Sequence, residues 1–304
     1  MKIAYLADCK SSHTKRWINY FKLRGHDVFA ITSEINDTIG VKQYNLMGGI
    51  RMPLASADSA FRYVFSPVSI HGVRRILADE KPDVVHAHYA SHYGFIAALV
   101  NYHPMILTTW GSDILINPDQ FRILRYMVKY ALKKADLITC DAEHMIKALD
   151  ELGAIHSKIH LIYFGTDTQK FNPKQRSMGL RARLGALDSS IIMSLRNLEP
   201  IYDIETFVKS VRIVLKKVPK ARFVIVGEGS QGVFLRALTK KLKVSKNVNF
   251  VGSIPSEEVA KYVASADIYV STSLSDAGLA ASTAEAMACG VPVIITDFGD
   301  NKRW

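Results

Sequence analysis

The chain has 304 residues, enough for two domains that each bury a core of their own. Its 48% hydrophobic and 22% charged residues are usual for a soluble α/β protein and exclude a disordered or fibrous chain, and no apolar run approaches the length of a membrane span. With 39 Lys and Arg against 28 Asp and Glu, the net charge of +11 favours an anionic partner such as a nucleotide diphosphate, an acidic lipid surface or nucleic acid.

Cysteine usage and the amino terminus bear on the compartment. Cys9, Cys140 and Cys289 stand far apart, in an odd number and without metal-ligand spacing, which is typical of reduced core thiols. The opening apolar run, residues 1–7, is too short for a signal peptide. The sequence therefore predicts a cytoplasmic protein whose contact with a membrane, if it has one, is peripheral and on the inner face.

The first half alternates short apolar runs with amphipathic segments, a pattern that predicts a parallel sheet covered by helices. Predicted strands are 2–7, 27–32, 83–88, 105–109, 136–139 and 158–163, and predicted helices are 15–24, 66–80 with Ser66 as its N-cap, 119–133, and 141–152 with Asp141 as its cap. A polar loop is expected over residues 8–14, and residues 35–65 show no clear pattern.

Polar and aromatic residues gather at the ends of these strands. His13 lies in the predicted loop 8–14, and His86 and His88 close the strand 83–88. Because side chains alternate along a strand, both of these histidines point to one face, where either a functional role or a satisfied packing role is open to them. No carboxylate or cysteine stands near them at metal-ligand spacing, so no metal is expected.

The helix predicted from Asp119 carries a basic stripe. Arg122, Arg125, Lys129 and Lys133 recur at three- and four-residue spacing, opposite an apolar face. Such a stripe could lie against anionic lipid headgroups, but an ordinary solvated face is the commoner meaning of this pattern.

The second half begins again with a strand, 190–195, followed by Arg196, whose planar guanidinium suits phosphate oxygens. Further strands are predicted at 221–226, 247–251, 267–270 and 293–296. Gly227, Glu228 and the glycines after them formally match the dinucleotide motif G-x-G-x-x-G. However, the acidic residue expected after the next strand is absent, and the motif lies in the middle of its domain.

The stretch 271–297 reads as strand, small-residue turn, helix and strand, with Gly290 ending the helix. Its turn, Gly278, Leu279, Ala280 and Ala281, would bring backbone N–H groups to a helix start, where a phosphate can approach closely. Glu285, one turn further, could accept hydrogen bonds from ribose hydroxyls. Equally, Glu285 could only complement the helix dipole while the small residues allow tight packing.

The run Glu285 to Ile294, EAMACGVPVI, resembles the signature of the family 4 retaining glycosyltransferases. DVVHAH at 83–88 and TTWGSD at 108–113 extend the resemblance over nearly the whole chain. It implies an α/β protein of GT-B architecture, with two Rossmann-like parallel-sheet domains facing across a cleft. An acceptor-side domain would span 1–170 and a nucleotide-sugar domain 171–304. The second domain is expected to be incomplete, since the chain ends where the family continues.

The resemblance also implies a reaction: transfer of a sugar, with retention, from a nucleotide-diphosphate donor to a hydroxyl of a glycan, lipid or small molecule. No metal, cofactor or nucleic acid partner is implied. The implied donor-binding residues are Arg196, Gly227, Glu228, Gly278, Leu279, Ala280 and, on the ribose, Glu285. Asp276 would contact the sugar and, with Glu285, His88 and Asp113, is a candidate catalytic residue. His13, His86, His88 and Trp110 would line the acceptor side.

Three positions depart from the family pattern. Ala277 stands where a glutamate is usual, Trp110 where a histidine is usual, and Tyr202 where a lysine is usual. Tryptophan cannot relay a proton, and a missing cation should weaken stabilisation of the departing diphosphate. Two alternatives therefore stay open: a catalytically silent nucleotide-sugar-binding protein and a GT-B-like sugar-nucleotide epimerase.

Overall fold

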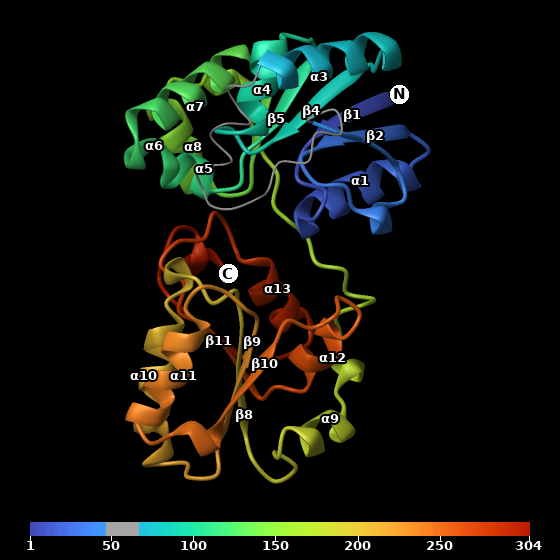
Figure 1. The fold of residues 1–304 in the computed structure, drawn as a ribbon. Coiled ribbons are helices and arrows are strands. Elements are labelled where there is room, and N and C mark those ends of the chain that lie inside the picture. Colours follow the sequence, from blue (N-terminus) through green and yellow to red (C-terminus); the bar gives the residue numbers. More distant parts are fainter. Residues whose placement is uncertain (47–66) are drawn as a thin grey trace. The chain divides into compact units, whose positions relative to one another are not determined.

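The computed structural model describes residues 1–46 and 67–304, which form two compact units, Met1–Tyr163 and Phe164–Trp304 (Figure 1). The predicted boundary near residue 170 lies slightly further along the chain. Phe171 is buried in the core of the second unit, so the segment that leads to it is held there.

The first unit is built on a seven-stranded sheet. Its strands are β1 (Lys2–Leu6), β2 (Asp27–Thr32), β3 (Lys42–Asn45), β4 (Val84–His88), β5 (Met105–Thr108), β6 (Leu137–Cys140) and β7 (Ile159–Leu161). All pair in parallel, in the order β3-β2-β1-β4-β5-β6-β7. The edge strand β3 was not predicted, because an edge strand pairs on one side only and its sequence, KQYN, has no apolar alternation.

Helices accompany these strands along the chain. They are α1 (Ser12–Leu23), α3 (Pro67–Glu80), α4 (Tyr93–Val100), α5 (Ser112–Leu115), α6 (Asn117–Gln120), α7 (Arg122–Lys134) and α8 (Glu143–Glu151). The helix predicted from Asp119 is broken at Phe121, whose backbone is extended, and the residue before α8 is Ala142, not the predicted cap Asp141. The N-cap predicted at Ser66 lies outside the described residues.

The prediction of a polar loop through residue 14 was wrong. Helix α1 begins at Ser12, so His13 and Thr14 lie in its first turn. The polar residues 11–14 suggested an exposed loop, but Thr14 faces inward and is buried, with its hydroxyl 3.3 Å from Nδ1 of His88.

The second unit has a five-stranded sheet. Its strands are β8 (Ile191–Leu195), β9 (Arg222–Val226), β10 (Val248–Gly252), β11 (Ile268–Ser271) and β12 (Val293–Ile295), all parallel in the order β10-β9-β8-β11-β12. The helices are α9 (Met178–Arg183), α10 (Ile204–Leu215), α11 (Gly232–Lys241), α12 (Val259–Ala264) and α13 (Ala281–Ala288).

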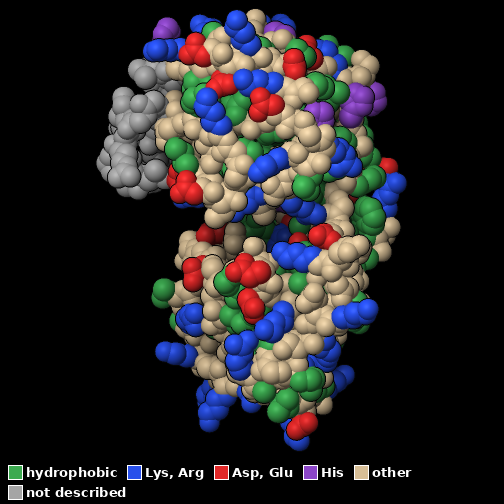
Figure 2. Space-filling model, turned by 90° about the vertical axis from the view of Figure 1, so that its right-hand side faces the viewer, with side chains coloured by type: hydrophobic (Ala, Val, Ile, Leu, Met, Phe, Trp, Pro, Cys, Tyr) green, Lys and Arg blue, Asp and Glu red, His purple; other side chains and the backbone are tan. Residues whose placement is uncertain are grey.

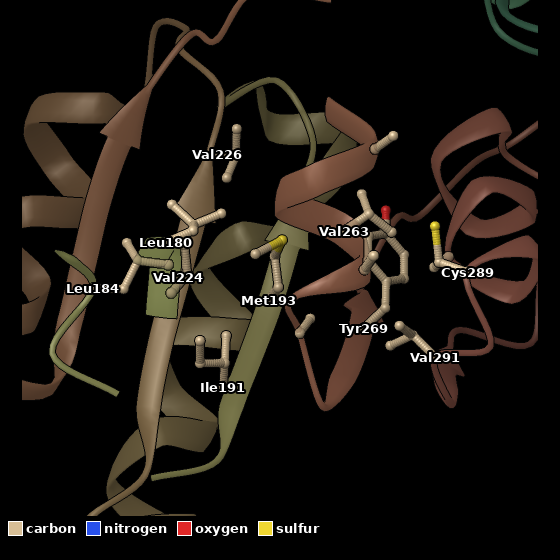
Figure 3. Close-up of a cluster of buried hydrophobic side chains, with 14 of the residues drawn as sticks. Leu180, Leu184, Ile191, Met193, Val224, Val226, Val263, Tyr269, Cys289 and Val291 are labelled. Carbon is tan, nitrogen blue, oxygen red and sulfur yellow. The ribbon is translucent and has the colours of Figure 1, made fainter. Parts of the chain in front are cut away.

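Alternate residues of these strands enter two apolar clusters, one on each face of the sheet. Met193, Val224 and Tyr269 pack with Cys289 from the end of α13 on one face (Figure 3). Ile192, Phe223 and Ile225 pack with Phe207 of α10 and Leu235 of α11 on the other. Burial of α13 against Tyr269 fixes where that helix begins relative to the ends of the strands.

The three cysteines are free and buried, as the sequence predicted. Within residues 1–46 and 67–304, no helix has both the length and the apolar character that crossing a membrane requires.

Candidate functional site

In the second unit, the predicted donor residues lie at one edge of the sheet. Arg196 follows β8, Gly227 follows β9, and Asp276 lies in the loop after β11. Since these strands are parallel, their carboxyl ends share an edge, which is where α/β sheets bind ligands.

Arg196 and Asp276 form a direct ion pair between the guanidinium Nη2 and the carboxylate Oδ1. The side chains are 10% and 13% exposed, so the pair is largely shielded from water. Burial raises the pKa of the Asp276 carboxyl, and the charge of Arg196 opposes that shift. Nη2 also donates to Ser273 Oγ at 3.2 Å, and the guanidinium carbon lies 4.4 Å from the centre of the Tyr202 ring.

Hydrogen bonds also connect the loop after β8 with the loop after β11. Thr272 donates its hydroxyl to the carbonyl oxygens of Tyr202 (3.1 Å) and Asp203 (2.7 Å), and the N–H of Leu274 donates to Ile201 O at 2.9 Å. These bonds hold the backbone of Tyr202, which stands where the resembled family usually has lysine, while its ring makes the cation–π contact with Arg196.

The glycine-rich loop owes its glycines to close packing. Gly227 has φ +132°, and a Cβ there would stand 2.2 Å from the carbonyl oxygen of Arg196. A Cβ at Gly229 would stand 2.6 Å from Leu198 O. Glu228 contributes its carbonyl oxygen to Leu198 N–H at 2.9 Å. The loop thus buttresses Arg196, and the donor contacts of Gly227 and Glu228 stay predictions.

Helix α13 follows the loop after β11, which carries Asp276. Its N-cap position is Ala280, which makes no side-chain capping bond, and its first turn has no acidic residue. Ser282 instead turns its hydroxyl into the core, 2.7 Å from the Tyr269 hydroxyl. The helix start therefore keeps N–H groups that no N-cap side chain satisfies, and Glu285 follows one turn later, partly buried. The predicted helix end at Gly290 is confirmed, with φ +70°.

In the first unit, four predicted residues join a cluster of rings in tilted and edge-to-face contact, which we call the ring cluster: Tyr5, His13, Trp17, His86, His88 and Trp110. His86 and His88 lie on one face of β4, as alternation predicted, with ring centres 4.8 Å apart. The rings of His13 and Trp110 are tilted against each other, with centres 4.6 Å apart, and both are partly exposed; Trp110 also contacts the buried His88.

Burial keeps these histidines neutral near pH 7. It lowers the pKa of His13 to about 4 and that of His86 to about 3, and it places the pKa of His88 well below its usual value. His86 Nε2 lies 2.6 Å from the Thr108 hydroxyl, which continues to Thr139 at 2.7 Å. His86 is thus satisfied within the core, whereas Nε2 of His88 has no hydrogen-bond partner among the described residues.

Asp113 is fully buried at the start of α5. One carboxylate oxygen accepts from Ala90 N–H at 2.7 Å and the other from Trp110 N–H at 2.9 Å. Burial raises the pKa of this carboxyl to about 6 against the opposing effect of these bonds. Asp113 therefore fixes the loops that follow β4 and β5, and its catalytic role stays a prediction.

Sequence reasoning missed several partners in both units. Tyr5 and Trp17 complete the ring cluster, and Ser273 joins Arg196. Tyr5 could have been found, because β1 pairs with β4 and places Tyr5 beside His86. In the described ranges, no group of three His, Cys, Asp or Glu side chains is arranged to hold a metal.

Two family models match the chain. Residues 2–142 match "Glycosyl transferase 4-like", and residues 179–303 match "Glycosyl transferases group 1".

Curated relatives match at 23–28% identity. A Bacillus subtilis glycosyltransferase assigned to teichuronic acid biosynthesis is 28% identical over 73% of this chain and 54% of its own length. N-acetyl-α-D-glucosaminyl L-malate synthase of Bacillus anthracis is 23% identical over 91% of this chain and 72% of its own. The sulfoquinovosyl transferase of Arabidopsis thaliana is 24% identical over 97% of this chain and 58% of its own length. The chain thus spans little more than half of the first and third of these relatives.

Solved structures share the fold. Anabaena HepE, crystallised with UDP-glucose, matches with a TM-score of 0.80 at 18% identity, over 100% of this chain and 82% of its own. Sucrose-phosphate synthase from Thermosynechococcus elongatus matches with a TM-score of 0.83 at 18% identity, over 99% and 82%. With the two parallel sheets, these likenesses confirm the predicted GT-B class of fold.

Proposed function

The chain belongs to the GT4-type glycosyltransferases, and from that premise we propose that it moves a sugar from a nucleotide-diphosphate donor to a hydroxyl acceptor with retention of configuration. The observation that carries this proposal is the buried Arg196–Asp276 ion pair at the carboxyl edge of the second sheet, in the unit where α13 starts without a side-chain cap.

On the donor side, the diphosphate would compete with Asp276 for the guanidinium of Arg196. Phosphate oxygens would then accept hydrogen bonds from Arg196 and from the N–H groups at the start of α13. Because the guanidinium and these N–H groups are held in place before the nucleotide sugar binds, they would stabilise the charge that develops on the leaving diphosphate. Asp276, displaced from Arg196, would be close enough to meet a hydroxyl of the donor sugar, and Glu285 would hold the ribose.

On the acceptor side, the partly exposed rings of His13 and Trp110 would offer a platform next to His88. Sugar rings stack on such faces, so a glycan, a glycolipid headgroup or a small glycoside would fit this chemistry. A neutral His88 could exchange a hydrogen bond with the acceptor hydroxyl.

A transfer assay tests the proposal. The protein is incubated with UDP-, GDP-, ADP- and dTDP-sugars and with glycan and lipid acceptors. Uridine donors come first because Anabaena HepE was crystallised with UDP-glucose. We expect an acceptor-dependent product whose anomeric configuration, read by proton NMR, equals that of the donor. We expect a chelator to leave the rate unchanged, since no metal or cofactor is proposed. An inverted product would overturn retention.

A silent nucleotide-sugar-binding protein is the second candidate, favoured by three departures from the family pattern: Ala277 in place of glutamate, Trp110 in place of histidine and Tyr202 in place of lysine. Calorimetry beside the transfer assay separates the two. Binding of a nucleotide sugar without turnover, on any acceptor, would support the silent protein. Conversion of the donor without an acceptor would point to an epimerase.

We propose that the protein acts in the cytoplasm, at the inner face of an anionic membrane. Two basic surfaces are candidates for that contact: the exposed face of α7 and a group of lysines in the second unit.

A further inference from the structure

Nearly all of the net positive charge of the chain comes from one stretch. Residues 206–256 contain eleven Lys and Arg against a single acidic residue, Glu228, which accounts for ten of the net charge of +11. The basic residues are Lys209, Arg212, Lys216, Lys217, Lys220, Arg222, Arg236, Lys240, Lys241, Lys243 and Lys246. The rest of the chain is therefore close to neutral.

Seven of these lysines, which we call the lysine edge, lie at the ends of α10 and α11 and in the loops that follow: Lys216, Lys217, Lys220, Lys240, Lys241, Lys243 and Lys246. These loops lead into β9 and β10, which are parallel neighbours, so both loops lie at the amino ends of the strands. This edge of the sheet is opposite to the one that carries Arg196.

Hydrogen bonds hold the two loops side by side. Asn247 Nδ2 donates to Ala221 O at 3.1 Å and to Pro219 O at 3.3 Å. Arg222 donates to Lys246 O at 2.5 Å and, through Nε, to Gly185 O at 3.1 Å, which adds the loop that leads into β8. Three adjacent loops therefore form one continuous edge.

All seven lysines are exposed, and none of them forms an ion pair within the described part of the chain. Two carboxylates also lie near the amino ends of these strands. Asp188 lies in the loop into β8, and Asp267, before β11, is already paired with Arg176 and Arg181. On the face shown in Figure 2, several blue side chains lie along the lower end of the second unit, with few red ones among them.

Helix dipoles explain only part of this pattern. Cations in the last turn of a helix are favourable, which accounts for Lys240 and Lys241. Lys220 lies outside the helices, and Lys246 lies in a single 3-10 turn, Ser245–Asn247, after α11. Lys243 occupies a left-handed position after α11, with φ +60°, where glycine is the favoured residue.

Apolar side chains stand among the lysines. Val218, between Lys217 and Lys220, is 45% exposed, and Leu187 in the loop into β8 is 52% exposed. Neither 212–222 nor 240–247 contains an aromatic residue on which a nucleic acid base could stack. Lysines interleaved with apolar tips suit a lipid headgroup layer, where ammonium groups meet phosphates and aliphatic tips enter the acyl boundary.

We propose that the lysine edge binds the surface of an anionic phospholipid bilayer, with Val218 and Leu187 entering the headgroup layer. The α7 face is the weaker candidate, because Arg125 is paired with Asp119 at 3.1 Å, which leaves four basic residues of this helix without an ion pair in the described part of the chain, against seven at the lysine edge. Binding at the lysine edge would leave the donor residues of the same sheet uncovered.

Co-sedimentation with vesicles tests this surface. The full chain is mixed with phosphatidylcholine vesicles that contain or lack phosphatidylglycerol, at low and high salt. We expect binding only to the anionic vesicles, weakened by salt. Lys216→Gln, Lys217→Gln and Lys220→Gln together should lower the affinity by at least about tenfold. Lys243→Gly should also lower it while relieving backbone strain, so its loss could not be blamed on unfolding.

The matched control removes the same charge from α7, with Arg122→Gln, Lys129→Gln and Lys133→Gln. This variant should keep most of the affinity of the parent. The proposal is overturned if the two triple variants lose affinity equally, if the parent does not bind anionic vesicles, or if it prefers a single-stranded RNA oligomer to them. Neither triple variant touches the donor residues, so transfer to a soluble acceptor should persist and separates this test from that of the reaction.

Discussion

Arg196 and Asp276 were predicted from sequence to contact different parts of the donor, and the structure pairs them with each other. Their residue types follow from the chemistry of phosphates and sugar hydroxyls, so the sequence could suggest both. The pairing depends on the loop after β11 folding back onto Tyr202, which is a long-range contact that no local pattern encodes.

Asp276→Asn tests the competition between carboxylate and phosphate. Because Asn does not neutralise the guanidinium, we expect the free nucleoside diphosphate to bind about tenfold more tightly, as a charged hydrogen bond is worth roughly 1.5–3 kcal/mol. Isothermal calorimetry measures this. Asp297→Asn, which removes an exposed carboxylate paired with Lys302, is the control. Unchanged or weaker binding in Asp276→Asn would show that the two groups do not compete.

His86 should make the stability of the first unit depend on pH. Its pKa is about 3 in the folded chain, so an unfolded chain binds an extra proton below the usual pKa of 6.5. The contribution of His86 to the free energy of unfolding is fully present above about pH 6.5 and falls as the pH drops, by up to about 1.4 kcal/mol per pH unit. Asp113, with its pKa raised to about 6, acts in the opposite sense in this range.

The difference between variants isolates the histidine from the other titrating groups. Urea unfolding from pH 6 to 4, followed by tryptophan fluorescence, should give His86→Gln a flatter dependence than the parent by about one proton. His160→Gln, at an exposed position, should match the parent. Equal slopes for His86→Gln and the parent would mean that His86 is not buried in its neutral form.

At the scale of elements, the sequence predicted the buried strands well and the edges and helix starts less well. β2 agrees at both ends with its predicted range, because a buried parallel strand is an apolar run bounded by polar residues. The unpredicted β3 and the early start of α1 depend on pairing and packing partners elsewhere in the chain. The ring cluster could not be predicted in full for the same reason, since Trp17 of α1 contacts histidines that lie on β4.

The close packing of the loop after β9 against Arg196 can be tested by substituting Gly227. Gly227→Ala should cost about 2 kcal/mol or more of unfolding free energy, because its Cβ would meet the carbonyl of Arg196 at 2.2 Å and its φ is +132°. Gly72→Ala, within α3 and with no atom within 4 Å, should instead stabilise by about 1 kcal/mol. Chemical denaturation measures both. A neutral Gly227→Ala would show that the two loops do not pack this closely.

For the molecule as a whole, composition predicted an anionic partner but could not say where it binds. The charge excess falls in the second unit, while the basic stripe that periodicity singled out lies on α7 in the first. Periodicity detects charges on one helix face, whereas the lysine edge joins two loops that only the strand order brings together. The GT-B class was accessible from sequence because its signature helix is a continuous local motif.

Whether Arg196 binds the diphosphate can be measured by comparing the binding of a nucleoside diphosphate and of its nucleoside to two variants. Arg196→Gln alone would leave Asp276 buried without its partner, so Arg196→Gln with Asp276→Asn is compared with Asp276→Asn. If Arg196 grips the diphosphate, the double variant binds UDP, or whichever diphosphate binds best, about tenfold to a hundredfold more weakly and binds the nucleoside equally well. Equal affinity of the two variants for the diphosphate would show that Arg196 does not bind it.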